Sequence, residues 1–209
     1  MICAVVLAAG RSVRMGQQKL LLPIRGTPMI RRIVDEVRRS SVDSIVVILG
    51  ADGPRIRDAL CNFPFAEKVG VRRQCDALTF ISNPNPTGDM LSSVRCGIRA
   101  LPDACNAVLL VLGDQPGLTV ALIEKLIDAF RSSKGAIIVP VHNGKRGHPL
   151  LFSARFGQEV LEKYDELGLH ALLNNHPAEV VEVETGPEMN LQDLDTPRDY
   201  DRFIQDTGS

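Results

Sequence analysis

The sequence predicts an α/β fold in which layers of helix, sheet and helix form a three-layer sandwich around a mostly parallel sheet. Short runs of β-branched and other apolar residues recur along the 209-residue chain, separated by stretches with helical periodicity. Most runs are apolar throughout, which is typical of strands that are covered on both faces. Strands that alternate with helices imply right-handed crossovers and therefore this α/β/α architecture. The expected strands are 3–9, 44–50, 77–82, 107–113, 136–140 and 178–184.

The expected helices lie between these strands. Thr27 and Pro28 suit the N-cap and first position of a helix over 28–40. Thr119 suits the N-cap of a helix over 120–133. Further helices are expected at 89–101, 153–163, 167–175 and 196–206.

Composition limits the possible partners. Lys and Arg number 24 against 25 Asp and Glu, so the net charge of −1 gives no general attraction to nucleic acid or to an anionic membrane. The N-terminus enters a strand directly, and no apolar run approaches the ~20 residues of a membrane span, which predicts a cytoplasmic protein. Because the sequence has neither repeats nor linkers, residues 1–209 are expected to form one domain.

The five cysteines are scattered, odd in number and without Cys-X-X-Cys spacing. This pattern argues against a disulfide framework and against a zinc site. A reducing cytosol is therefore the expected compartment.

Four unusual loops follow the expected strands. They are GRSVRMGQQK after 3–9, NPNPTGDMLSS after 77–82, DQPGLT after 107–113 and VHNGKRGHP after 136–140. In open α/β sheets, ligands bind beyond the carboxyl ends of the strands, where such loops converge. The sequence therefore predicts one active site at this edge of the sheet.

The first loop combines glycines with basic side chains. Glycine lets backbone amides approach an anion, and Arg or Lys adds charge-assisted hydrogen bonds to phosphate oxygens. The loop is neither the dinucleotide fingerprint, since Ser12 stands at the second glycine position, nor a Walker loop, since Leu20 follows Lys19. It predicts a site for a free nucleoside triphosphate, with a solvated surface loop as the alternative.

A carboxylate follows the strand 107–113. Asp114 stands between Gly113 and the Gln115-Pro116 turn, where it is well placed to hold Mg²⁺ by oxygen ligation. A turn-forming aspartate is the alternative. The phosphate-binding loop expected at the same edge favours the metal-binding interpretation.

Several stretches resemble the MobA-like nucleotidyltransferases, and within that family the molybdenum cofactor cytidylyltransferase branch. LAAGRSVRMGQQKLLLPIRGTPMI is similar to the N-terminal signature, and NPNPTGDMLSSVRCGI, LLVLGDQP, NGKRGHPLLF and DLDTPRDYDRF follow in order, so the resemblance covers nearly the whole chain. It implies a Rossmann-like fold of the nucleotide-diphospho-sugar transferase type. It also implies transfer of a nucleoside monophosphate from an NTP to a phosphorylated acceptor such as molybdopterin, with release of pyrophosphate. The LAAG context favours CTP.

The resemblance also assigns roles to residues. Arg14, Lys19 and Asp114 would be catalytic, the first two by gripping phosphates and Asp114 by binding Mg²⁺. The nucleotide-binding residues would be Leu7, Ala8, Ala9, Gly10, Arg11, Ser12, Arg14, Lys19, Asn83, Gly88, Ser92 and Ser93. For the loop 83–93, a helix N-cap is an equal alternative to contacts with base and ribose.

Two further sites are less sharply defined. The resemblance places a second metal contact near the C-terminus, where Asp193 is the first choice and Asn190 the second, while Asp195 also qualifies but can instead cap the last helix. Lys145, Arg146 and His148 would receive the acceptor's phosphate, with a tight glycine turn as the alternative.

The chain departs from the family pattern in two places. Asp89 separates Gly88 from Met90 where relatives run Gly-Met directly, and the acceptor motif before the last strand appears only as YDELGLHALLNNHP. Two alternatives therefore stay open, a sugar-phosphate nucleotidylyltransferase and a non-catalytic nucleotide-binding maturation factor for molybdoenzymes. If the chain is a molybdenum cofactor cytidylyltransferase, molybdoenzymes or cofactor-insertion proteins are possible contacts.

Overall fold

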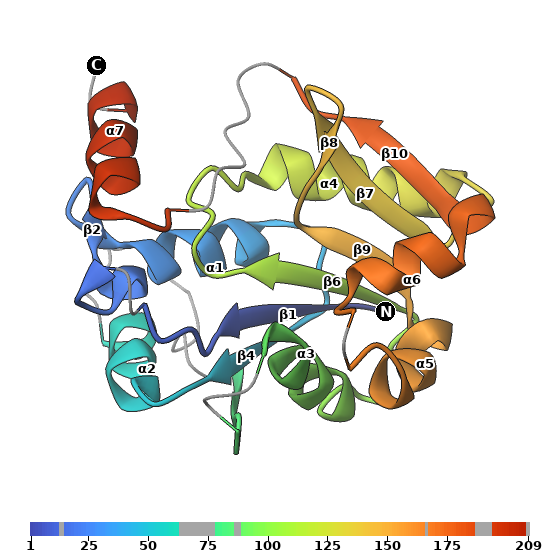
Figure 1. The fold of residues 1–209 in the computed structure, drawn as a ribbon, viewed down its shortest axis with the longest axis horizontal. Helices are drawn as coiled ribbons and strands as arrows, with labels where there is room; N and C mark the ends of the chain where they lie inside the picture. The colour runs from blue at the N-terminus through green and yellow to red at the C-terminus, as the bar shows by residue number, and fades with distance from the viewer. Residues whose placement is uncertain (13–14, 63–77, 86–88, 166, 187–193, 208–209) are drawn as a thin grey trace.

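The computed structural model describes residues 1–12, 15–62, 78–85, 89–165, 167–186 and 194–207. Its main sheet has eight strands, in the order β10-β7-β9-β6-β1-β4-β5 with β8 paired to β7, and β2 and β3 form a separate two-stranded sheet. Figure 1 shows this sheet between two layers of helices. The strands are β1 (Ile2–Ala8), β2 (Pro23–Ile24), β3 (Thr27–Pro28), β4 (Ser44–Leu49), β5 (Leu78–Ser82), β6 (Ala107–Leu112), β7 (Ile137–His142), β8 (Lys145–Arg146), β9 (Leu150–Ser153) and β10 (Val180–Glu184).

The sheet is parallel except around β8 and β9. Strand β1 pairs in parallel with β4 on one side and with β6 on the other. The predicted three-layer fold with a mostly parallel sheet is thus confirmed. Strand β9 pairs antiparallel with both β6 and β7, which the sequence analysis did not anticipate. Its four residues are too short a run to show a period.

Helices cover both faces of the sheet. They are α1 (Met29–Arg39), α2 (Gly53–Cys61), α3 (Met90–Arg99), α4 (Val120–Ser132), α5 (Gly157–Glu162), α6 (His170–Asn175) and α7 (Pro197–Thr207). Helices α1 and α4 lie on one face and α3 and α5 on the other (Figure 1). None of the helices in the described part of the chain combines the length and apolar composition that a membrane span requires.

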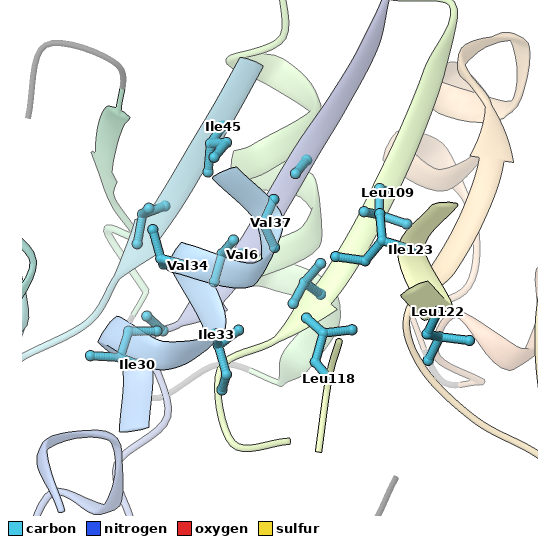
Figure 2. Packing of buried hydrophobic residues seen from close by; sticks show 14 of the residues in the cluster. Val6, Ile30, Ile33, Val34, Val37, Ile45, Leu109, Leu118, Leu122 and Ile123 are labelled. Carbon is cyan, nitrogen blue, oxygen red and sulfur yellow. The ribbon is translucent and has the colours of Figure 1, made fainter. Parts of the chain in front are cut away.

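Two hydrophobic cores result from the alternation of side chains along each strand. Val6 of β1 belongs to the core under α1 and α4, while its neighbour Val5 belongs to the core under α3. Figure 2 shows the first of these cores, with Ile33 and Val37 of α1 packed against the sheet beside Val6. Burial on both faces explains why these strands are apolar throughout.

Two local expectations are wrong, and one helix was missed. Thr27 does not cap α1, because it pairs in β3 and the cap position falls on Pro28, which makes no side-chain cap bond. Helix α2 was not predicted. Cys61, at the end of α2, is disulfide-bonded, whereas Cys3, Cys96 and Cys105 are free thiols. The expectation that the chain has no disulfide is therefore wrong, because spacing along the sequence does not determine which cysteines the fold brings together.

Candidate active site

A cavity of about 430 Å³ lies at the carboxyl end of β1, between the segments that follow β5 and β6. This is the edge of the sheet where the sequence analysis expected the loops to converge. The cavity is lined by Leu7, Ala9, Gly10, Arg11, Ser12, Lys19, Leu20, Asn83, Asp89, Met90, Ser93, Leu112 and Asp114. Most of the described residues predicted to bind nucleotide are therefore gathered around one hollow.

Among the predicted nucleotide-binding residues, Ala8 ends β1, while Gly10 and Arg14 belong to the first loop. Ala8 is 1 % exposed and belongs to the core on the α1 side, because successive strand residues face opposite ways. Gly10 lines the cavity, and a Cβ added there would meet no atom within 4 Å. The backbone at Gly10 therefore presents open space to a ligand. Arg14 lies outside the described residues.

A hydrogen-bond network fixes the shape of the first loop. The Ser12 hydroxyl accepts from the Lys19 amide at 3.0 Å and donates to Gln18 Oε1 at 2.8 Å. Gln18 is 7 % exposed, and its Nε2 donates to the Gly10 carbonyl and to Asp52 Oδ2, each at 3.1 Å. Sequence reasoning missed Gln18 and Asp52, because a glutamine among basic residues gives no signal of burial.

Two glycines let neighbouring segments approach this loop. A Cβ on Gly113 would lie 2.7 Å from the Leu7 carbonyl oxygen, which also accepts a hydrogen bond from the Gly113 amide at 3.0 Å. A Cβ on Gly50 would lie 2.5 Å from the Ala9 carbonyl oxygen. Only glycine fits at such separations. Gly113 therefore brings Asp114 directly beside the end of β1.

Lys19 joins two carboxylates that are far apart in the sequence. Its Nζ lies 2.6 Å from Asp114 Oδ2 and 2.9 Å from Asp195 Oδ1. Burial lowers the pKa of the ammonium, but the attraction of Asp114 and Asp195 outweighs it, so the pKa of Lys19 is raised above its usual value. The Leu194 amide donates to the Asp114 carbonyl at 3.3 Å and holds the C-terminal segment in place.

The alternative that Asp195 caps the last helix is wrong. Thr196 takes this role, since its hydroxyl accepts from the Asp199 amide at 3.2 Å and its amide donates to Asp199 Oδ2 at 2.8 Å. The Asp195 side chain instead faces Lys19. Asn190 and Asp193, the other predicted metal contacts, lie outside the described residues.

The far end of the cavity is formed by the start of α3. Asn83 Nδ2 donates to the hydroxyls of Ser92 and Ser93, each at 3.0 Å. Asp89 caps α3, with Oδ1 accepting from the Ser92 amide at 3.0 Å. The loop 83–93 therefore does contain the N-cap of a helix, as the alternative interpretation expected, and the capping side chain is that of Asp89. Asn83, Asp89, Met90 and Ser93 line the cavity, whereas Ser92 does not, and Gly88 lies outside the described residues.

The structure does not bring the predicted acceptor residues together. Lys145 and Arg146 form the exposed strand β8, and Arg146 Nε contacts Glu182 Oε1 at 2.7 Å. His148 is turned inward, with Nδ1 buried and without a hydrogen-bond partner among the described residues. Burial, followed by the neighbouring His170, lowers the pKa of His148 to about 4 despite the attraction of Asp114. Its imidazole is therefore neutral near pH 7.

The donor set suits a hard divalent cation. Mg²⁺ is usually bound through one or two carboxylates, with water and substrate phosphates completing the octahedron. Asp114 and Asp195 supply two carboxylates that approach one point closely enough to share the Lys19 ammonium. Among the residues with described positions, no group of three or more His, Cys, Asp or Glu side chains could hold a metal ion. A bound ion would therefore need oxygen ligands from water and from the substrate phosphates.

Two relatives match almost the entire chain. The molybdenum cofactor cytidylyltransferase of Escherichia coli (strain K12) is 29% identical over 197 residues, which cover 94% of this chain and 92% of that protein. The nicotine blue oxidoreductase of Paenarthrobacter nicotinovorans is 26% identical over 212 residues, which cover 97% of this chain and 96% of that protein.

A solved structure has the same architecture. Rv0371C of Mycobacterium tuberculosis H37Rv, in a complex with manganese, is 25% identical and superposes with a TM-score of 0.74 over 98% of each chain. The family model of the MobA-like NTP transferase domain matches residues 4–180, which include most of β1, the first loop and Asp114. The chain therefore belongs to the MobA-like NTP transferase family and is a nucleotidyltransferase.

Proposed function

We propose that this chain transfers CMP from CTP to the phosphate of molybdopterin or its molybdenum form and releases pyrophosphate. The observation that carries this proposal is the meeting of Lys19, Asp114 and Asp195 at one end of the cavity, beside the glycine-bearing first loop. The E. coli relative's name supports the choice of nucleotide and acceptor. We infer the transfer of a nucleoside monophosphate from membership of the family, and the acceptor from the similarity to the E. coli protein.

The cavity is lined by the charged groups of Arg11, Lys19, Asp89 and Asp114 and by neutral polar groups that include Asn83 and Ser93. Lys19 and Arg11 would neutralise the triphosphate, while the backbone at Gly10 would approach it. The base and ribose would then extend toward Asn83 and Ser93, whose amide and hydroxyl groups can exchange hydrogen bonds with them. This orientation places the α-phosphate next to Asp114.

Mg²⁺ would be held by Asp114 and Asp195. When bound, the ion would supply Lewis-acid stabilisation of the charge that develops on the phosphate oxygens. We propose Asp195 in place of Asp193 because its carboxylate reaches the same ammonium as Asp114 does. The manganese complex of Rv0371C agrees with a divalent ion in a similar fold.

The chain would act mainly by positioning and charge. An oxygen of the acceptor phosphate attacks the α-phosphorus, and the bond from this phosphorus to the bridging oxygen breaks as pyrophosphate leaves. The attacking phosphate is already ionised near neutral pH, so no side chain has to remove a proton. Lys19 and Arg11 would counter the charge of the leaving pyrophosphate.

Among the predicted acceptor residues, His148 would take part only if its inward-turned imidazole became accessible, and its neutral form could then offer a hydrogen bond without adding charge. Lys145 and Arg146 would reach the acceptor only if the β8 hairpin moved toward the cavity. Molybdoenzymes or proteins that insert their cofactor would collect the product, and the cytoplasm would be the compartment.

A thermal-shift panel tests the nucleotide first. CTP, GTP, ATP and UTP are each added with and without Mg²⁺, and a ligand at a hundred times its Kd raises the stability of the folded state by about 2.7 kcal/mol. CTP with Mg²⁺ should give the largest shift. Equal shifts for all four, or none, would contradict the assignment of CTP.

Pyrophosphate release tests the acceptor. With CTP, Mg²⁺ and molybdopterin, release should depend on the pterin and should not occur with hexose 1-phosphates. Release with a sugar phosphate alone would point to a sugar-phosphate nucleotidylyltransferase. Tight nucleotide binding with no release from either acceptor would point to a maturation factor that binds nucleotide without turnover.

A further inference from the structure

The ammonium of Lys19 occupies the point where a divalent ion would meet its two protein ligands. Its Nζ contacts Asp114 Oδ2 at 2.6 Å and Asp195 Oδ1 at 2.9 Å. These contacts use one oxygen of each carboxylate. The proposed nucleotide-binding lysine is therefore also the counter-ion of the proposed metal ligands.

A divalent ion and this ammonium cannot share the position. Mg²⁺ binds oxygen at about 2.0–2.1 Å, well inside the distances that the ammonium keeps. A divalent ion a few ångströms from an ammonium would also be repelled strongly, because their Coulomb energy is inversely proportional to their separation and is weakly screened in a partly buried site. Lys19 therefore has to leave at least one carboxylate before the ion can bind both.

The local structure allows this movement. The Lys19 amide is fixed by Ser12 Oγ at 3.0 Å, so the loop stays in place while the flexible four-carbon side chain reorients. The Asp114 and Asp195 side chains are 23% and 38% exposed, so water and ions can reach them. Lys19 also lines the cavity proposed for the triphosphate. A triphosphate bound there would offer the Lys19 ammonium a second set of anionic oxygens.

We propose that Lys19 competes with the divalent ion for Asp114 and Asp195, and that a polyphosphate relieves this competition by drawing the ammonium into the cavity. This inference rests on the proposed function and extends it to the order of binding. The ion alone binds weakly, and nucleotide and ion strengthen each other's binding. By thermodynamic linkage, each tightens the other by the same factor.

The test is a titration with Mn²⁺ alone, followed by the electron paramagnetic resonance signal of the free ion. Lys19→Met and Lys19→Gln should bind Mn²⁺ at least about tenfold more tightly than the unaltered protein, a difference of about 1.4 kcal/mol. Lys125→Met is the matched control, since Lys125 is an exposed residue whose ammonium contacts the Glu184 carbonyl on β10. It should leave the Mn²⁺ affinity unchanged.

A double variant locates the gained affinity. Lys19→Met combined with Asp195→Asn should lose the tighter binding, because one of the two carboxylates is then neutral. Unchanged Mn²⁺ affinity in both Lys19 variants, with circular dichroism showing that they are folded, would overturn the inference. An equal gain in Lys125→Met would overturn it too, because net charge would then be the cause.

The outcome is separable from the proposed function. Mn²⁺ binding requires neither CTP nor an acceptor, so tighter binding by the Lys19 variants would support the competition even if no NTP released pyrophosphate. Failure of the competition would likewise leave nucleotidyl transfer standing, because pyrophosphate release is measured in the unaltered protein.

Discussion

A buried cation, Arg31, and a partly buried one, Lys19, are held in opposite ways in this molecule. Arg31 on α1 is 1% exposed, contacts Asp35 one turn later at 2.9 Å and donates to the Leu60 carbonyl at 2.6 Å. Lys19 contacts two carboxylates from distant parts of the chain, at the edge of a cavity. The Arg31 ion pair lies within α1, and its hydrogen bond to the Leu60 carbonyl joins α1 to α2. The Lys19 ion pairs instead face a space that a ligand can enter.

The pKa shifts of these groups differ in sign. Burial lowers the pKa of Arg31 and raises that of Asp35, in each case by more than their mutual attraction offsets. For Lys19 the attraction of Asp114 and Asp195 exceeds the effect of burial, and its pKa is raised. For Arg31, the attraction of Asp35 therefore offsets the effect of burial only in part. Two carboxylates stabilise the ammonium at a site where it can be exchanged.

The largest expected effect is on turnover. Asp114→Ala should lower Mg²⁺-dependent pyrophosphate release by about 10³-fold, because it removes one of two proposed metal ligands. Asp128→Ala on the exposed side of α4 is the control and should have normal activity. An unchanged dependence of the rate on Mg²⁺ concentration in Asp114→Ala would assign the ion to other ligands.

The next effect is on stability. Arg31→Met should lower the free energy of unfolding by about 3 kcal/mol, at the low end for a broken buried ion pair because the Asp35 side chain is 27% exposed. Urea denaturation measures this loss. Adding Asp35→Leu should restore part of it, since the uncompensated carboxylate is then removed. A single variant as stable as the unaltered protein would show that neither this ion pair nor the Arg31 hydrogen bond to Leu60 contributes to the stability of the fold.

Lys19→Met should show the reverse pattern. Turnover should fall by about 10²-fold through loss of a charge that faces the phosphates. The free energy of unfolding should change by less than about 1 kcal/mol, because the two carboxylates are partly exposed and screened by solvent. Steady-state kinetics and urea denaturation on the same preparation compare the two quantities. A stability loss like that of Arg31→Met would mean that Lys19 is structural.

The smallest expected effect concerns His148. Its pKa is lowered to about 4 in the folded protein, so protonation favours the unfolded chain, whose histidine titrates near 6.5. The resulting stability is present above pH 6.5 and is lost as the pH falls toward 4. Between pH 7 and pH 5 this amounts to about 2 kcal/mol. Urea denaturation at the two pH values measures this loss. From pH 7 to pH 5, His148→Gln should lose about 2 kcal/mol less of its free energy of unfolding than the unaltered protein does. An equal loss in both proteins would mean that the imidazole is exposed to water.

The sequence predicted the fold better than the details of the site. Continuous apolar runs identified β1, β4, β6 and β7, because strands buried on both faces leave a strong signal. The edge strands β5 and β10 were also predicted, although they expose some of their residues. Helix α2 escaped because it is short and opens with Gly53-Pro54, which indicates a turn as readily as a helix start. Strand β9 was missed because its run of four residues is too short to show a period.

Within the site, the sequence predicted which charged residues would be present and which strands they would follow, but not which side chains would contact one another. Lys19 and Asp114 stood out as a basic residue in a glycine-bearing loop and an acid after a buried strand. Nothing local indicated that Asp195 would reach them while Thr196 capped the helix. The contact between Gln18 and Asp52, 34 residues apart, likewise depends on the tertiary fold.

The central claim is that a triphosphate and a divalent ion meet between the first loop, Asp114 and Asp195. A crystal structure with Mn²⁺ and a CTP analogue resistant to cleavage at the α-phosphate tests this claim most directly, because anomalous scattering locates the manganese. We expect manganese coordinated by Asp114 and Asp195, with Lys19 Nζ moved onto a phosphate oxygen. Manganese and triphosphate bound elsewhere, with Lys19 still joining the two carboxylates, would contradict it.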